Sequence, residues 1–350
     1  MRAMVVRRYG PPDVLEWHEV PDPELEANQV VIRVAAVGIN FADLLARLGI
    51  YQGTPKPPFV PGLEVAGTVE QVPPAPVGRG KRLAKEDAPF QVGERVAALT
   101  MFNGYAERVA VPERQVFHIP EGVTVEEAAA LPVNYLTAYH SMFQMGNLQE
   151  GDRVLVHGAA GGLGVAAVQL AKARKLVVLG TAGPAKQEFL QKMGVDYPID
   201  HSREDFEEVI RRTFGDGIEM VLDAIGGKSF AKSYRCLGPT GRLVVYGFST
   251  VVAASGRRNL WKIGKALLET PRFHPLKLIN DNKSVIGVHI GRMPGHAALL
   301  KREMEEIFKM YAAGQVKPVI GKTFPLEHAA ESHRYIHARQ NVGKVILKVT

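Results

Sequence analysis

Cysteine is nearly missing from this sequence, which has 350 residues and a single Cys at position 236. One cysteine excludes an internal disulfide and any metal site built from clustered thiolates. Long apolar runs are missing as well, since none approaches the roughly 18 residues that a transmembrane helix needs. The first residues, MRAMVVRRYG, lack the apolar core and cleavage site of a secretory signal. We therefore expect a cytoplasmic protein without a transmembrane segment.

Runs of lysine and arginine with interleaved aromatic residues are also missing, which argues against a nucleic-acid partner. The formal net charge of +7 at pH 7 is a moderate excess that favours anionic cofactors or acidic substrates. Apolar residues make up 46% and charged residues 23% of the chain, as in ordinary globular proteins. The length is sufficient for two domains with cores of their own.

Residues 153–172, RVLVHGAAGGLGVAAVQLAK, predict a dinucleotide-binding turn. The apolar run 154–156 suits a strand that is buried on both faces of a parallel sheet. Residues 159–164 then allow a tight turn, and apolar residues recur at helical spacing from about Gly162 onward. A helix that begins at such a turn offers free N–H groups and the positive end of its dipole to a pyrophosphate. Compared with the usual G-x-G-x-x-G, Ala159 stands where the first glycine is expected.

The second strand of this unit indicates which dinucleotide is bound. Residues 177–179 form an apolar run at the distance that a strand-helix-strand unit requires. NAD sites usually carry an acidic residue at the end of this strand, and this chain has Gly-Thr-Ala-Gly followed by Lys186. Small residues and a lysine leave room and positive charge for a ribose 2′-phosphate, which favours NADP. The alternative is that Lys186 is an ordinary solvated helix residue.

The pattern of elements changes near Thr124. Before it, short β-rich runs are separated by Pro and Gly turns, which predicts a sandwich or partly open barrel. After it, strands and helices alternate, which predicts a doubly wound parallel sheet. Residues 73–91 break the pattern and are expected to form a surface loop or an extended hairpin. The expected strands are 3–6, 29–37, 63–72, 95–98, 106–111, 154–156, 177–179, 195–199, 220–222, 243–246, 285–290 and 343–349, and the expected helices are 41–48, 125–130, 136–143, 204–214, 229–237, 261–268, 296–312 and 328–336.

Several stretches resemble the medium-chain dehydrogenase/reductase superfamily, in its zinc-free quinone oxidoreductase branch. They are VGINFADLLARLGIY (37–51), PGLEVAGTV (61–69), AALPVNYLTAYHSM (129–142), the glycine-rich stretch above and NVGKVILKV (341–349). Within this branch, residues 233–250, 257–268 and 284–293 are similar to the synaptic-vesicle membrane protein (vesicle amine transport) homologue subgroup. The resemblance implies an α/β fold: a Rossmann dinucleotide-binding domain of residues 125–295, and a GroES-like β-rich catalytic domain that combines residues 1–124 and 296–350.

Two departures from the zinc-bearing alcohol dehydrogenases of this superfamily bear on the chemistry. In those relatives a Cys and a Gly-His-Glu supply metal ligands, whereas here Asn40 stands at the Cys position and Leu63 at the His position. The four-cysteine lobe that holds structural zinc is also missing. We therefore expect no metal, and an acceptor that needs less activation than an alcohol, such as a quinone or an α,β-unsaturated carbonyl.

The resemblance places the substrate between the two domains, beside Asn40, Asp43 and Tyr51. Asn40 would donate an N–H group to the substrate carbonyl, and Tyr51 an O–H group. Asn40 could instead cap a turn and Tyr51 could simply pack on the surface. For Asp43, a structural role is favoured over that of a general acid.

By the same resemblance the cofactor is NADPH, with Gly161, Gly162 and Leu163 on its pyrophosphate. Thr181 and Lys186 would flank the adenosine ribose, and His201 would lie beside the 2′-phosphate. The full set of implied cofactor-binding residues is Asn40, Thr137, Ala160, Gly161, Gly162, Leu163, Thr181, Lys186, His201, Ile225, Gly247, Phe248, Asn341 and Lys344. His157 and Cys236 are expected to be core or surface residues.

These features predict an NADPH-dependent, metal-free reductase that transfers hydride to quinones or α,β-unsaturated carbonyls. One alternative is an enoyl-thioester reductase, in which Tyr51 would protonate the α-carbon. Another is a nucleotide-binding protein with a lipid-, RNA- or partner-binding role and little catalysis; Asn40, Tyr51 and the lack of basic tracts favour the enzyme. Strands within 243–246 and 283–290 correspond to a subunit interface in relatives, which implies a homodimer.

Overall fold

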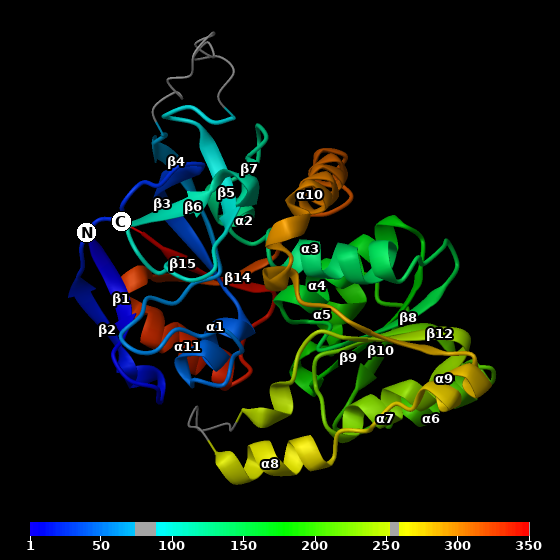
Figure 1. Ribbon diagram of the computed structural model, residues 1–350. Helices are drawn as coiled ribbons and strands as arrows, with labels where there is room; N and C mark the ends of the chain where they lie inside the picture. Colours follow the sequence, from blue (N-terminus) through cyan, green and yellow to red (C-terminus); the bar gives the residue numbers. More distant parts are fainter. Residues whose placement is uncertain (74–88, 253–258, 350) are drawn as a thin grey trace.

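The computed structural model describes residues 1–73, 89–252 and 259–349, and these form two halves, each built around its own sheet (Figure 1). One half is β-rich and the other carries a parallel sheet, so the predicted fold class is confirmed. The predicted surface segment 73–91 lies almost entirely outside the described residues. Within the described residues, no helix combines the length and the apolar character needed to cross a membrane.

The parallel sheet has the strand order β10-β9-β8-β11-β12-β13. Counted along the chain this is the order 3-2-1-4-5-6 of a dinucleotide-binding fold, in which ligands bind at the carboxyl ends of the central strands. Its strands are β8 (Arg153–His157), β9 (Val177–Ala182), β10 (Tyr197–Asp200), β11 (Ile218–Asp223), β12 (Leu237–Val245) and β13 (Ser284–Gly287). The switch in strand order falls between β8 and β11, directly below the glycine-rich turn.

Strand β8 shows why the sheet is buried on both faces. Val154 and Val156 belong to one apolar core and Leu155 to another, and all three side chains are completely buried. The first core includes residues of α4 (Gly162–Ala173) and α10 (Ala297–Ala312), and the second includes residues of α6 (Phe206–Thr213) and α7 (Lys228–Arg235). The other helices of this half are α3 (Asn134–Tyr139), α5 (Gln187–Lys192), α8 (Leu260–Leu268) and α9 (Pro275–Asp281).

The β-rich half contains a sheet of order β14-β15-β3-β4-β5-β7, with β6 also paired to β3. Segments far apart in sequence meet here, because β15 pairs antiparallel with β3. The strands are β3 (Gln29–Ile39), β4 (Glu64–Gln71), β5 (Arg95–Leu99), β6 (Arg108–Pro112), β7 (Val116–His118), β14 (Ile320–Pro325) and β15 (Lys344–Lys348); β1 (Arg2–Val6) and β2 (Leu15–Glu19) form a separate hairpin. The helices are α1 (Phe41–Arg47), α2 (Val125–Ala128) and α11 (Ala329–His337).

The tail of the chain contributes to both halves: β14 and β15 join the β-rich sheet, while α10 packs into a core of the parallel-sheet half. The division into domains at residues 124 and 296 stays a prediction. Two expected strands are displaced, since the strand expected at 195–199 begins at Tyr197 and the one expected at 285–290 ends at Gly287.

Candidate active site

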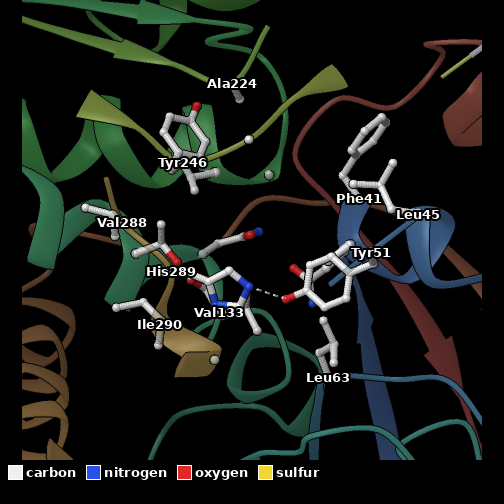
Figure 2. Close-up of a pocket in the computed structure, with 18 of the residues that line it drawn as sticks. Phe41, Leu45, Tyr51, Leu63, Val133, Ala224, Tyr246, Val288, His289 and Ile290 are labelled. Carbon is white, nitrogen blue, oxygen red and sulfur yellow. Dashed lines mark hydrogen bonds between the residues drawn. The ribbon is translucent and has the colours of Figure 1, made fainter. Parts of the chain in front are cut away.

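A cavity of about 1000 Å³ lies between the two halves. Its walls come from α1 and the segment that follows it, from the turn between β8 and α4, from the ends of β12 and β13, and from the segment before β15. Figure 2 shows a mainly apolar lining, with Phe41, Leu45 and Leu63 on one side and Val288 and Ile290 on the other. The cavity therefore sits at the carboxyl edge of the parallel sheet, where the strand order predicts a ligand.

The glycine-rich turn at the edge of this cavity is built around two glycines. Gly158 has a φ of 64°, in the left-handed region where a side chain is strained. A Cβ on Gly164 would lie 2.3 Å from the Gly158 carbonyl oxygen, so only glycine lets α4 approach the turn. Gly158 directly precedes Ala159, which stands at the position of the first glycine of the motif. Gly161, Gly162 and Leu163 line the cavity at the start of α4, where free N–H groups and the helix dipole suit an anion.

A chain of hydrogen bonds supports this turn from below. Ser233 Oγ donates to Asp223 Oδ2 at 2.7 Å, so it accepts the Nε2–H of His157 at 3.1 Å. His157 Nδ1 is then free to accept from the hydroxyl of Thr181 at 3.1 Å, and Thr181 Oγ1 in turn accepts the N–H of Gly158 at 3.2 Å. Burial lowers the pKa of His157, in agreement with this neutral tautomer. His157 and Thr181 thus hold the turn in place.

The segment before β15 links the turn to the β-rich half. Gly343 N–H donates to the carbonyl of Ala160 at 2.8 Å, and Lys186 Nζ donates to the carbonyl of Asn341 at 2.6 Å. Burial and the nearby Arg339 both lower the pKa of Lys186. Two cations, Lys186 and Arg339, therefore lie close together at the edge of the turn. His201 lies near Gly183, because a Cβ on Gly183 would be 3.9 Å from its Nε2.

Deeper in the site, Asn40, Glu64 and Lys344 form a buried polar cluster. Lys344 Nζ donates to Asn40 Oδ1 at 2.8 Å and pairs with Glu64 Oε1. Asn40 Nδ2 donates to Glu64 Oε1 at 2.8 Å and to the carbonyl of Gly38 at 3.2 Å. Both amide hydrogens of Asn40 are therefore occupied within the protein, and donation to a substrate would require one of these bonds to open. The second carboxylate oxygen of Glu64 accepts the N–H of Val133 at 2.7 Å.

Asp43 is completely buried behind this cluster and does not line the cavity. Its carboxylate accepts the backbone N–H of Asn40 at 2.8 Å and that of Gly62 at 3.2 Å. Burial raises its pKa to about 7, although these N–H groups and Lys344 oppose the shift. Asp43 thus fixes the start of α1 and with it the backbone of Asn40.

Tyr51 and His289 meet at the wall of the cavity (Figure 2). Their side chains are joined by a hydrogen bond of 3.0 Å between Tyr51 Oη and His289 Nε2, and their rings stack at 5.6 Å with an angle of 27°. Burial raises the pKa of Tyr51 to about 12 and lowers that of His289. Tyr51 comes from the β-rich half and His289 from the segment after β13, so this bond connects the two halves.

The electrostatic character of the cavity is positive. Arg114, Arg292, Arg339 and Lys344 line it, and among the described lining residues there is neither Asp nor Glu. A cavity of this kind favours an anionic ligand and stabilises negative charge that develops on a substrate oxygen.

The structure thus places the residues that the sequence suggested in two groups. Those that line the cavity are Asn40, Tyr51, Thr137, Gly161, Gly162, Leu163, Gly247, Phe248, Asn341 and Lys344. Those that lie behind or beside the lining are Asp43, Ala160, Thr181, Lys186, His201 and Ile225. Sequence reasoning missed Glu64, His289, Arg292 and Arg339 as members of the site. Glu64 could have been found, because it follows Leu63 in the motif that lacks the zinc-binding histidine.

A doubly wound parallel sheet, a second β-rich half and a cavity between them define the class of two-domain dehydrogenases and reductases. Two family models match the chain: "Alcohol dehydrogenase GroES-like domain" over residues 26–121 and "Zinc-binding dehydrogenase" over residues 193–347. The chain belongs to the medium-chain dehydrogenase/reductase family.

Its relatives include proteins of several names. The synaptic vesicle membrane protein VAT-1 homolog of Danio rerio is 38% identical over 99% of this chain and 69% of that protein. The crystal structure of the human VAT-1 homolog-like protein superposes with a TM-score of 0.83, at 32% identity over 100% of this chain and 98% of that one. The quinone oxidoreductase of Thermus thermophilus, solved alone and with NADPH, gives 0.80 at 34% identity over 99% and 100% of the two chains. An enoyl reductase and a 2-haloacrylate reductase, both 29% identical, each give 0.79.

The zinc in the name of the second family model does not fit the donor set of this site. Asn40 presents an amide and Leu63 no donor atom, while Glu64 is already paired with the ammonium group of Lys344. Among the described residues, no group of three or more His, Cys, Asp and Glu is arranged to hold a metal ion. A buried ion pair of Lys344 and Glu64 thus occupies this part of the site.

Proposed function

We propose that this protein is an NADPH-dependent reductase of quinones and α,β-unsaturated carbonyls that works without zinc. The observation that carries the proposal is the cavity itself, which has a phosphate-binding turn at its edge, apolar walls and four cationic side chains. Such a site suits a dinucleotide beside a flat, apolar acceptor that becomes negatively charged during reduction. The names of the quinone oxidoreductase relatives agree with this assignment.

The residues at the turn fit the cofactor. Glycines at 161 and 162 leave the start of α4 bare, and a Cβ on Gly162 would lie 2.5 Å from Asn134 Nδ2. Gly161, Gly162 and Leu163 would hold the pyrophosphate through backbone N–H groups. When bound, the reduced nicotinamide supplies a hydride. Thr137, Gly247 and Phe248, which line the same cavity, would orient the ring that carries it.

Selectivity for NADPH over NADH is assigned to Lys186 and Arg339, and His201 would be a further group beside the 2′-phosphate. We expect Lys186→Ala and Arg339→Ala each to weaken NADPH binding by about 10-fold or more, because each removes a charge-assisted hydrogen bond worth about 1.5–3 kcal/mol. NADH binding should stay within about twofold of wild type, because NADH has no 2′-phosphate. The measurement is fluorescence titration with both dinucleotides.

The matched control is Lys192→Ala. Lys192 lies on α5 close to Lys186, but it is exposed and pairs with Glu188. If Lys186→Ala and Arg339→Ala bind NADPH as tightly as Lys192→Ala does, the 2′-phosphate does not lie at this edge of the turn.

The donor set at the substrate end does not suit a metal ion that would polarise a carbonyl group. The substrate must therefore be one that accepts hydride readily. Tyr51 would donate its O–H to the substrate oxygen from the cavity wall. Arg292, which lines the cavity and whose charge acts on Tyr51, would contribute positive potential that stabilises negative charge there, while Glu64 and Asp43 hold Lys344 and Asn40 in place. Apolar side chains such as Leu45 and Val288 exclude water from the reacting atoms.

The test is consumption of NADPH with a panel of ortho- and para-quinones and enones. Turnover with at least one class, in protein from which metals have been removed by chelation, is the expected result. Tight NADPH binding without turnover on any acceptor would contradict the reductase and leave a nucleotide-binding protein with a lipid-, RNA- or partner-binding role.

Reduction of enoyl thioesters is a second candidate, and the observation that favours it is Tyr51, whose hydroxyl lies on the cavity wall where it could protonate an α-carbon. An enoyl reductase of the same fold adds support. Including an enoyl-pantetheine in the panel separates the candidates, because a thioester reductase turns it over faster than any quinone.

A further inference from the structure

The reaction proposed above needs a proton as well as a hydride, and the cavity offers few groups that can supply one. Its described lining contains no carboxylic acid. Both ring nitrogens of His157 are engaged below the glycine turn. The hydroxyl of Tyr246, which is partly buried, points toward Ala224 and away from Tyr51 and His289 (Figure 2). Tyr51 and His289 both line the cavity and are hydrogen-bonded to each other, and Tyr51 is the less exposed of the two.

His289 connects Tyr51 with solvent. The His289 residue is exposed, Tyr51 is only partly so, and the 3.0 Å bond between Oη and Nε2 joins them. A continuous path therefore leads from water, through the imidazole, to the hydroxyl on the cavity wall. The two residues come from opposite halves of the protein, so the path is complete only when both halves are in place.

The local packing is arranged around this pair. A Cβ on Gly291 would lie 3.2 Å from His289 Cε1 and 3.8 Å from Tyr51 Oη, so the bare glycine leaves room for the ring. The charged groups that face the pair are Arg292, which lowers the pKa of both His289 and Tyr51, and Asp43, which raises that of Tyr51. Tyr51 thus keeps its proton throughout the physiological pH range, and the lowered pKa of His289 keeps its ring neutral there, with one nitrogen that donates and one that accepts.

We propose that His289 is the positioning residue that relays protons from solvent to Tyr51, which passes them to the substrate. This inference rests on the proposed reductase function. The acceptor gains two electrons as hydride from the dinucleotide, and one proton as the Tyr51 O–H bond breaks and a new O–H bond forms on the substrate. His289 Nε2–H then returns a proton to the Tyr51 phenolate, while Nδ1 takes one from water.

The experiment compares His289→Gln, Tyr51→Phe and the double variant with wild type. Glutamine keeps a hydrogen-bonding group near Tyr51 but cannot exchange protons at neutral pH. We expect kcat for the best acceptor to fall by about 100-fold in each single variant, with KM within about twofold and a larger solvent isotope effect for His289→Gln. The double variant should be no slower than Tyr51→Phe, because both residues act in one path.

Two further measurements guard against a purely structural effect. Gly291→Ala should displace the imidazole and reproduce a milder form of the His289→Gln defect. In the protein without dinucleotide, the midpoint of the NMR titration of the His289 ring should differ between Tyr51→Phe and wild type. The matched control is His18→Gln, a partly exposed histidine on β2 that pairs with Glu16, which should behave as wild type in every measurement.

The outcomes separate the relay from the function. A wild-type enzyme that reduces quinones or enones, together with a His289→Gln variant of normal kcat and isotope effect, overturns the relay and leaves the reductase intact. Additive losses in the double variant overturn it as well. A wild-type protein that reduces no acceptor overturns the proposed function, and the relay with it.

Discussion

At the scale of single residues, the Lys344–Glu64 pair dominates the substrate end of the cavity. Their side chains are 3% and 0% exposed, so this ion pair is shielded from water. Such a pair contributes little net stability, but removal of one partner leaves a buried charge without compensation, which costs about 3–5 kcal/mol. The pair therefore makes the site sensitive to changes in either residue.

We expect Lys344→Met to lower the free energy of unfolding by about 3–5 kcal/mol, because the Glu64 carboxylate is left buried without its cation. The double variant Lys344→Met/Glu64→Gln should recover most of the loss. Lys348→Met, which removes an exposed lysine of the same strand, should change stability by less than about 1 kcal/mol. Urea unfolding measures all three. A single Lys344→Met variant as stable as wild type would show that water reaches Glu64.

Asp43 gives the protein a specific dependence on pH. Its pKa is about 7 in the folded protein and about 3.8 when unfolded, so the folded state binds more protons between these values. The stabilisation that protonated Asp43 contributes to the folded state is fully present below about pH 4 and is lost as the pH rises to about 7. It amounts to about 1.4 kcal/mol for each pH unit by which the folded and unfolded pKa values differ. Asp43→Asn should flatten this part of the curve, measured by urea unfolding at several pH values. An unchanged slope in Asp43→Asn would assign the pH dependence to other groups.

The roles of some residues of the site could be predicted from the sequence. Asn40 and Leu63 stood out because they replace metal ligands, and both line the cavity. His289 and Arg339 did not, because a histidine or arginine outside a motif looks like any surface residue. His289 matters through its hydrogen bond with Tyr51, which lies 238 residues away, and Arg339 through its charge near Lys186. No local pattern encodes either relation.

At the scale of elements, α4 depends on its approach to the turn below it. A Cβ on Gly164 would lie 2.3 Å from the Gly158 oxygen and 2.6 Å from Ala159 Cα, so the helix would have to move away. Because the start of α4 forms the proposed phosphate site, displacement of this helix affects binding as well as packing.

We therefore expect Gly164→Ala to cost about 1–3 kcal/mol of stability and to weaken NADPH binding. The matched control is Gly264→Ala in α8, where an added Cβ meets nothing within 4 Å. That change should stabilise the protein by up to about 1 kcal/mol, because alanine favours helix over glycine. Thermal unfolding and NADPH titration compare the two. If Gly164→Ala and Gly264→Ala have the same stability and the same NADPH affinity, the turn can rearrange to admit a Cβ.

The elements that the sequence revealed are those with strong apolar periodicity. The three consecutive buried residues of β8 predicted a parallel strand, and the structure confirms it. β2 and β14 were missed, because each buries only one residue and β14 contains both Gly and Pro. Their strand conformation comes from pairing with β1 and β15, which is tertiary information.

At the scale of the whole molecule, β13 forms one edge of the parallel sheet. We propose that a second copy pairs along this edge to give a homodimer. Val288 N–H bonds to β12, so by the alternation of a strand the N–H groups of Val285 and Gly287 face the open side. The open edge thus keeps hydrogen-bonding groups available to a partner.

Sedimentation velocity should therefore give the mass of two chains for wild type. Val285→Pro removes an outward donor and keeps the bonds to β12, so we expect it to sediment as a folded monomer. Circular dichroism checks that the fold is retained. A wild-type monomer at micromolar concentration, or a Val285→Pro dimer, would contradict pairing along this edge.

The distance along the chain between Lys344 and its partners also bears on how the protein is made. Asn40 and Glu64 precede Lys344 by 304 and 280 residues, and the whole parallel sheet is encoded between them. At about 5–20 residues per second, a ribosome needs about 14–56 s to cover the 280 residues. Until Lys344 has been synthesised, the Glu64 carboxylate lacks the cation with which it pairs when buried. The parallel-sheet half can therefore fold while it is being synthesised, whereas the β-rich half, although it begins first, closes last.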